Sequence, residues 1–164
     1  MFLKATTQLV NDTVIIRDTD GNEITRFVAV WQRPDSKTRK ALLKARMANL
    51  KSLQTAQLEL QADPENYDAE AFSATLSAIE DDGKARIRQH LNRIDGLLDD
   101  TDQPVDFTPA VIDELFRWTE YTTPLAESLA RLAEGRTVEE ARLKNSVPLV
   151  GTGPVAPAVA EMAA

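Results

Sequence analysis

Two alternating runs near the start of the chain predict a β-hairpin. Residues 3–17 alternate loosely between apolar and polar positions and are rich in Thr, Val and Ile, and residues 23–31 form a second run, EITRFVAVW. Residues 18–22 between them are typical of a turn, in which Gly21 can take a positive φ. The unbroken apolar stretch from Phe27 to Trp31 indicates a strand covered on both faces. Because a hairpin alone is only marginally stable, we expect it to pack on helices or to pair with a second copy.

Apolar positions then recur every three or four residues, which predicts a first long helix over residues 36–61. Pro34 ends the preceding run, and Asp35 or Ser36 can cap the helix. These positions form one apolar stripe along the helix. The stripe consists of Leu42, Ala45, Asn49, Leu53, Ala56 and Leu60, and it is widened by Leu43, Met47 and Leu50.

A second helix is predicted after the N-cap Asp68. Its helical spacing is kept by Phe72, Leu76, Ile79, Gly83, Ile87 and Leu91. Gly83 is a place for a kink or an end, since glycine costs roughly 1 kcal/mol against alanine inside a helix. The short break at residues 63–66 predicts that the two helices form an antiparallel hairpin. Residues 91–98 either end the second helix or form a short strand.

The dipeptide Thr-Pro occurs twice in the last third of the chain, at Thr108-Pro109 and Thr123-Pro124. Threonine caps free N–H groups, and proline at the first helical position loses no hydrogen bond. We therefore expect helices over residues 109–120 and 124–134, the second ending at Gly135. Residues 137–140 fit a capping box for a last helix that ends near residue 144.

Together these elements predict an α+β fold that is mostly α-helical. It has an N-terminal β-hairpin, or small antiparallel sheet, followed by a helical hairpin and short C-terminal helices. We expect a β-rich part over residues 1–34, a helical domain over residues 35–145 and a flexible tail over residues 146–164. The tail contains Pro, Gly, Ala and Val with almost no charge, so it is either an apolar arm for binding or the end of a linker.

Composition narrows the classes of function. The 164 residues carry a net charge of -7, which disfavours binding to nucleic acid or to an anionic membrane. There is no cysteine, which excludes disulfides, thiolate metal sites and a cysteine nucleophile. The first half of the first helix is nevertheless basic, and its cations are Lys37, Arg39, Lys40, Lys44, Arg46 and Lys51. This basic face is either solvated or a docking surface for an acidic partner or a second copy.

Candidate chemistry is sparse. An acid cluster, Asp99, Asp100, Asp102 and Asp106, precedes a helix start, where negative charge is favourable. We interpret it as a solvated loop, with a divalent-ion site and a catalytic carboxylate pair as the alternatives. Asp18 and Asp20 have the spacing of a calcium loop without its later ligands, and we interpret them as a turn. His90, the single histidine, is expected at the surface. We predict no catalytic, metal-binding or cofactor-binding residue and no enzyme.

The segment QPVDFTPAVIDELFRW, residues 103–118, resembles the helix entry of tail assembly chaperones of long-tailed bacteriophages. In that family a D-x-x-G-x-P-V-x-F-T/S loop precedes a helix that ends in L-F/L. The preceding IDGLLDDTD, residues 94–102, stands where the family has a W-x-G-V-x-D segment. The order of a β-rich start, a charged helical middle, this loop and terminal helices is also similar. The likeness covers roughly residues 24 to 144.

This resemblance implies a non-enzymatic protein that keeps the tape measure protein, a long helical ruler of the tail, soluble during assembly. It implies work in the cytoplasm of the bacterial host, absence from the mature virion and self-association. The alternative is a structural tail or head-tail connector component that stays in the particle. The expected partner contacts lie on the C-terminal helices, through Phe116, Trp118, Tyr121, Leu125, Leu129 and Leu132. Each of these side chains can instead belong to the core, and an exposed aromatic among them is the informative exception.

Overall fold

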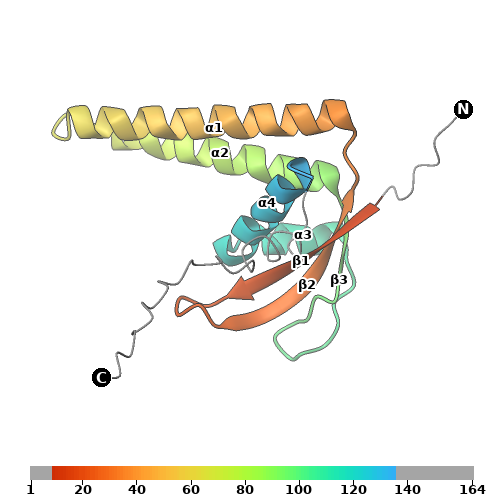
Figure 1. Cartoon of the computed structure of the whole chain (residues 1–164). Helices are drawn as coiled ribbons and strands as arrows, with labels where there is room; N and C mark the ends of the chain where they lie inside the picture. Colours follow the sequence, from red (N-terminus) through yellow and green to blue (C-terminus); the bar gives the residue numbers. More distant parts are fainter. Residues whose placement is uncertain (1–8, 136–164) are drawn as a thin grey trace, which may run out of the picture.

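A three-stranded antiparallel sheet forms one side of the molecule (Figure 1). The computed structural model describes residues 9–135. Strand β1 (Leu9–Arg17) pairs with β2 (Glu23–Gln32), which confirms the predicted hairpin. The turn between them has Gly21 at φ 85° and is held by the Asp18 carboxylate, which accepts the N–H groups of Asp20 and Asn22 at 2.9 and 2.8 Å. The remainder of the first predicted strand, residues 3–8, lies outside the described residues.

The third strand, β3 (Leu91–Asp95), settles the choice left open for residues 91–98. It follows the second helix without a loop and pairs antiparallel with β2, so that the sheet order is β1-β2-β3. The register places Ile94 opposite Ala29 and Arg93 opposite Val30. This strand comes from the middle of the stretch predicted to be a separate helical domain, and it ties that stretch to the N-terminal hairpin.

Helices α1 (Ser36–Ala62) and α2 (Ala69–His90) form the predicted antiparallel hairpin. The predicted caps are present, since Asp35 accepts the N–H of Thr38 at 2.7 Å and Asp68 accepts that of Ala71 at 3.0 Å. Helix α2 runs through Gly83 without an end. The far end of the hairpin extends away from the sheet (Figure 1).

The two Thr-Pro pairs have different outcomes. Thr108 caps α3 (Pro109–Leu115) with Pro109 in the first position, as predicted, although the helix ends at residue 115 rather than 120. The second prediction is wrong, because Pro124 is the sixth residue of α4 (Thr119–Ala133), which begins after Trp118. Tyr121 stacks on Phe27 of the sheet, with ring centroids 6.4 Å apart, and this packing stabilises the first turn of α4 before the proline. At this position, beyond the first turn, proline removes one backbone hydrogen bond and its ring crowds the carbonyl four residues earlier, so the start of α4 depends on tertiary packing.

Helix α4 lies between the sheet and the helical hairpin and contacts both (Figure 1). Its apolar side packs on the inner face of the sheet, where Trp31 and Leu125 are fully buried. The overall fold is therefore the predicted α+β fold with mostly α-helix. Within residues 9–135, none of the helices combines the length and apolar character that a membrane crossing requires. The helix predicted near residues 137–144 and the tail lie outside the described residues.

Candidate interaction surface

Of the six residues predicted to contact a partner, four are buried in the structure, one is half-buried and one is exposed. Four of them are buried in the core between the sheet, α3 and α4: Phe116, Leu125, Leu129 and Leu132. Tyr121 is half-buried against Phe27. The sixth, Trp118, has 55% of its surface exposed. In this structure, Trp118 is therefore the one member of the predicted set that presents its side chain to a partner.

Trp118 occupies the junction between α3 and α4. It has the extended backbone of an N-cap, and its carbonyl accepts the hydroxyl of Thr122 at 3.1 Å and the first backbone N–H groups of α4. Its backbone is thus fixed while its indole ring is in solvent. Large aromatic side chains in such a position are typical of binding surfaces.

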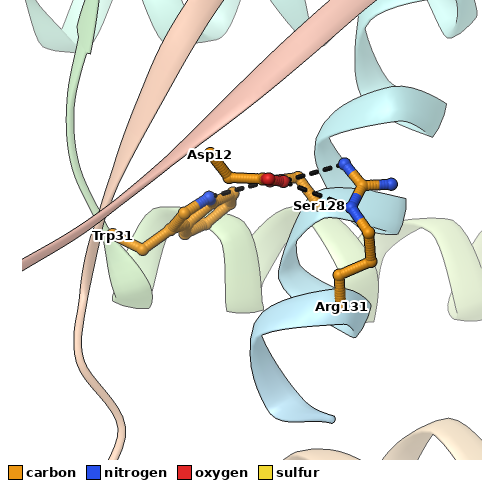
Figure 2. Close-up of polar contacts among 4 residues, drawn as sticks. All are labelled: Asp12, Trp31, Ser128 and Arg131. Carbon is orange, nitrogen blue, oxygen red and sulfur yellow. Dashed lines mark hydrogen bonds and ion pairs between the residues drawn. The ribbon is translucent and has the colours of Figure 1, made fainter. Parts of the chain in front are cut away.

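A buried polar cluster joins β1, β2 and α4 (Figure 2). The Asp12 carboxylate, 3% exposed, accepts hydrogen bonds through one oxygen from Ser128 at 2.6 Å and from Arg131 at 2.8 and 3.3 Å. The Ser128 hydroxyl in turn accepts the indole N–H of Trp31 at 2.9 Å. Ser128 is fully buried, so its hydroxyl cannot meet a substrate. The cluster therefore fixes α4 on the sheet rather than forming a reactive site.

This cluster was not predicted from the sequence, although the chain carries a signal for it. Asp12 occupies an inward position of β1, in alternation with Val14 and Ile16. Ser128 lies within the apolar stripe of α4, beside Leu125 and Leu129. A polar residue on an otherwise apolar face of both elements indicates a buried hydrogen-bonded pair.

The acid cluster before α3 is a hydrogen-bonded loop. Hydrogen bonds from the backbone of Gln103 and from the hydroxyl and backbone of Thr101 lower the pKa of Asp99. Asp102 has a positive φ of 59°, and a single bridge between Leu98 and Pro104 closes the loop. Among the described residues, the His, Asp and Glu side chains form no group of three that could hold a metal ion.

His90 is the last residue of α2 and is partly buried rather than fully at the surface. Burial lowers the pKa of its imidazole, and the positive charge of Arg86 acts in the same direction. The imidazole is therefore more readily neutral than in a free histidine.

An apolar groove of about 400 Å³ lies between α1, α2 and α4. Its apolar side chains come from all three helices: Leu42, Leu50 and Leu53 of α1, Ile79 of α2, and Ala126, Leu129, Ala130 and Ala133 of α4. Gly83 of α2 also lines it, and a Cβ built at this glycine has no atom within 4 Å. The groove is therefore open at the position where a side chain of α2 would otherwise fill it.

Polar contacts hold the walls of the groove together. Arg46 of α1 pairs with Glu134 at the end of α4 at 2.7 Å. Asn49 of α1 donates to Asp82 of α2 at 2.9 Å, and Asp82 also pairs with Arg86 at 2.8 Å. The hydrogen bonds from Arg86 lower the pKa of Asp82, with Asn49 contributing in the same direction. Helix α1 is thus linked by polar contacts both to the end of α4 and to α2.

Beside the groove, α1 exposes a row of apolar side chains that we call the outer stripe. It consists of Leu43, Met47, Leu50 and Leu58, whose exposed fractions lie between 37 and 65%. The prediction that Leu43, Met47 and Leu50 widen the buried stripe of α1 is therefore wrong, because that side of the helix faces solvent. Leu50 belongs to the outer stripe and also lines the groove, so the two apolar surfaces are continuous.

Comparison of the chain with protein-family models, with curated proteins and with solved structures finds no match. The surface itself offers two connected features, an apolar groove between three helices and an exposed apolar row that continues from it.

Proposed function

We propose that this protein binds a helical segment of another polypeptide and acts as a non-enzymatic assembly chaperone. The observation that carries the proposal is the groove between α1, α2 and α4 with the outer stripe beside it. Grooves lined by the apolar faces of helices receive the apolar face of an amphipathic helix. Contiguous exposed apolar surface marks an interaction site, because an isolated domain normally buries it.

The resemblance of residues 103–118 to tail assembly chaperones supplies the partner in this proposal. The partner is the tape measure protein of a long-tailed bacteriophage, bound in the host cytoplasm and released before the virion is complete. Self-association belongs to the same proposal, with β1 at the edge of the described sheet as the pairing element. Trp118, at the junction of α3 and α4, adds an exposed aromatic side chain to the proposed contacts.

If gene order places a long helical protein directly downstream, co-expression with that protein tests the proposal. The measured quantity is the soluble fraction of that partner with and without this chain. A matched pair of variants tests the groove: Gly83→Leu fills it, whereas Gly83→Ala adds a single methyl group where a Cβ has free space. We expect wild type and Gly83→Ala to keep the partner soluble and Gly83→Leu to fail, while urea unfolding shows both variants at least as stable as wild type, since both residues favour a helix more than glycine does.

Two results count against the proposal. If the partner is no more soluble with the wild-type chain than without it, the protein is not its chaperone. If purified particles contain this chain in stoichiometric amount, the alternative of a structural tail or head-tail connector component is supported instead.

A further inference from the structure

We infer that the outer stripe is the docking site for an amphipathic helix whose flanking residues are acidic. The inference rests on the proposed function in one respect, namely that the bound partner is a helix. It adds the charge of that helix and the surface to which it binds.

The first observation is the geometry of the outer stripe. Leu43, Met47, Leu50 and Leu58 follow one another at spacings of four, three and eight residues. Such spacings bring side chains to one side of an α-helix. Single exposed leucines are ordinary on protein surfaces, but a row along one helix is the seam that a second helix uses. Leu50 connects this seam to the groove, so a docked helix gains apolar contacts from α4 as well.

The second observation is the charge beside the outer stripe. Lys40, Lys44 and Lys51 are spaced by four and seven residues, so they follow one flank of the stripe. All three are exposed, and none of them forms an ion pair with a residue that the structure describes. We call them the lysine row.

The arginines of α1 have a different use. Arg39 donates to the carbonyl of Ala133 at 3.1 Å, and Arg46 pairs with Glu134. Both arginines thus fix the end of α4 to α1. The basic half of α1 therefore contains arginines that hold the fold together and lysines that flank the exposed outer stripe. The charge of these lysines is complementary to an acidic helix.

A second copy of α1 fits this site poorly. In an antiparallel pair that places Leu43 against Leu58 of the copy, Lys44 meets Gln57 and Lys40 meets Gln61. The same register brings the two copies of Lys51 to one level, where like charges repel. Helix α1 contains one acid, Glu59, among its 27 residues, so it cannot neutralise the lysine row. A flat anionic membrane would reach the lysines but would leave the concave groove beside Leu50 unfilled.

The test uses the full chain and two designed helical peptides of about four heptads, each with leucine at the a and d positions. One peptide carries glutamate at the flanking e and g positions and the other carries lysine at the same positions. Fluorescence anisotropy at low salt measures the Kd of each. We expect the Kd of the acidic peptide to be lower than that of the basic peptide by roughly tenfold or more. Each of the three lysines contributes a modest electrostatic attraction, and the three contributions add.

Two variants of the site give separate readouts. The triple substitution Lys40→Glu, Lys44→Glu and Lys51→Glu is expected to reverse the preference between the peptides. The double substitution Met47→Ser and Leu50→Ser is expected to weaken both peptides by roughly tenfold or more, since it removes two apolar anchors. Circular dichroism checks that both variants keep their helices.

Matched controls lie elsewhere on the surface. Arg17→Glu, Arg33→Glu and Arg93→Glu change the net charge by the same amount on exposed residues of the sheet and its borders, and should leave the preference for the acidic peptide in place. Leu76→Ser removes an exposed leucine of α2 and should leave both Kd values unchanged.

The inference is overturned if neither peptide binds, if both bind equally, or if the lysine-row variant keeps the wild-type preference. It is also overturned if a concentration-dependent dimer is lost on Met47→Ser without any peptide binding, which assigns the seam to a second copy. Binding to anionic vesicles in place of the acidic peptide overturns it in favour of a membrane.

Co-expression separates this inference from the proposed function. If the wild-type chain and the Met47→Ser, Leu50→Ser variant solubilise the downstream partner equally, the docking site is wrong and the chaperone function stands. If the wild-type chain fails to solubilise the partner, the function is wrong, and the peptide measurements still decide whether the outer stripe binds acidic helices.

Discussion

The sheet with α4 and the α1–α2 hairpin show two opposite uses of apolar residues. In the sheet and α4, large side chains such as Trp31 and Leu125 are fully buried around a hydrogen-bonded carboxylate. In α1 and α2, both described in full, just Leu42, Ala56 and Ile87 are buried. A polar contact between the two helices of the hairpin is the hydrogen bond from Asn49 to Asp82, which also pairs with Arg86 within α2. The difference indicates that the sheet with α4 forms the packed core, whereas the hairpin leaves much of its apolar surface exposed.

The largest expected effect tests this contrast with one substitution in each region. Leu125→Ala leaves a cavity in the packed core and should lower the free energy of unfolding by about 3–5 kcal/mol. Leu58→Ala removes a side chain that is already in solvent and should change it by less than about 0.5 kcal/mol. Urea unfolding measures both. Equal losses would show that the outer stripe is part of the core.

The next effect concerns the buried polar cluster. Arg131→Met removes the ion pair and the hydrogen bonds that Arg131 makes with the buried Asp12 carboxylate, and should lower the free energy of unfolding by about 2–3 kcal/mol. The control, Arg117→Met, breaks an exposed pair with Glu114 and should cost less than about 1 kcal/mol. Chemical denaturation of both variants measures these free energies of unfolding. A loss for Arg131→Met no larger than the control would mean that the cluster does not stabilise the sheet against α4.

Glycine substitutions are expected to have opposite signs in the two regions. Gly135 has φ 74°, and a Cβ there would approach a guanidinium nitrogen of Arg39 to 2.7 Å. Gly135→Ala should therefore destabilise the protein by about 1 kcal/mol or slightly more. Gly83→Ala, in the hairpin, should stabilise it by about 0.5–1 kcal/mol through helix propensity. Thermal unfolding of both variants gives the comparison, and two shifts of the same sign would contradict it.

The smallest effect is the dependence of stability on pH through the loop at Asp99. The hydrogen bonds from Gln103 and Thr101 hold its folded-state pKa below the ordinary value of 3.8, so its contribution to stability is present above that pH and is lost as the pH falls through the folded pKa. Asp99→Asn cannot titrate and should flatten the decrease in stability below about pH 4. Unfolding midpoints measured between neutral and acidic pH check this, and superimposable curves for the two proteins would exclude the effect.

Local signals predicted the elements well where the neighbouring residues decide the structure. Thr108-Pro109 starts a helix because the cap and the proline act within one turn. The same dipeptide at Thr123-Pro124 does not, because the stacking of Tyr121 on Phe27 joins residues far apart in sequence. Strand β3 stayed ambiguous for a related reason, since its pairing partner β2 lies about sixty residues earlier.

The candidate site was harder to predict, because helical spacing indicates which residues share a side of a helix but not which side is covered. Leu42 and Leu43 are adjacent and equally apolar, yet α2 and α4 cover the first and leave the second exposed. The same limit applies to α4, where Leu125 and Leu129 were expected at a partner surface and lie in the core. The apolar pattern therefore identified both helices but did not show which of their apolar side chains are exposed.

The bond between Ser128 and Asp12 joins residues 116 positions apart. During translation, the sheet cannot be closed by α4 until Ser128 has left the ribosome, whereas α1 and α2 are complete much earlier in the chain. The nascent protein thus displays its helical hairpin before its core has formed.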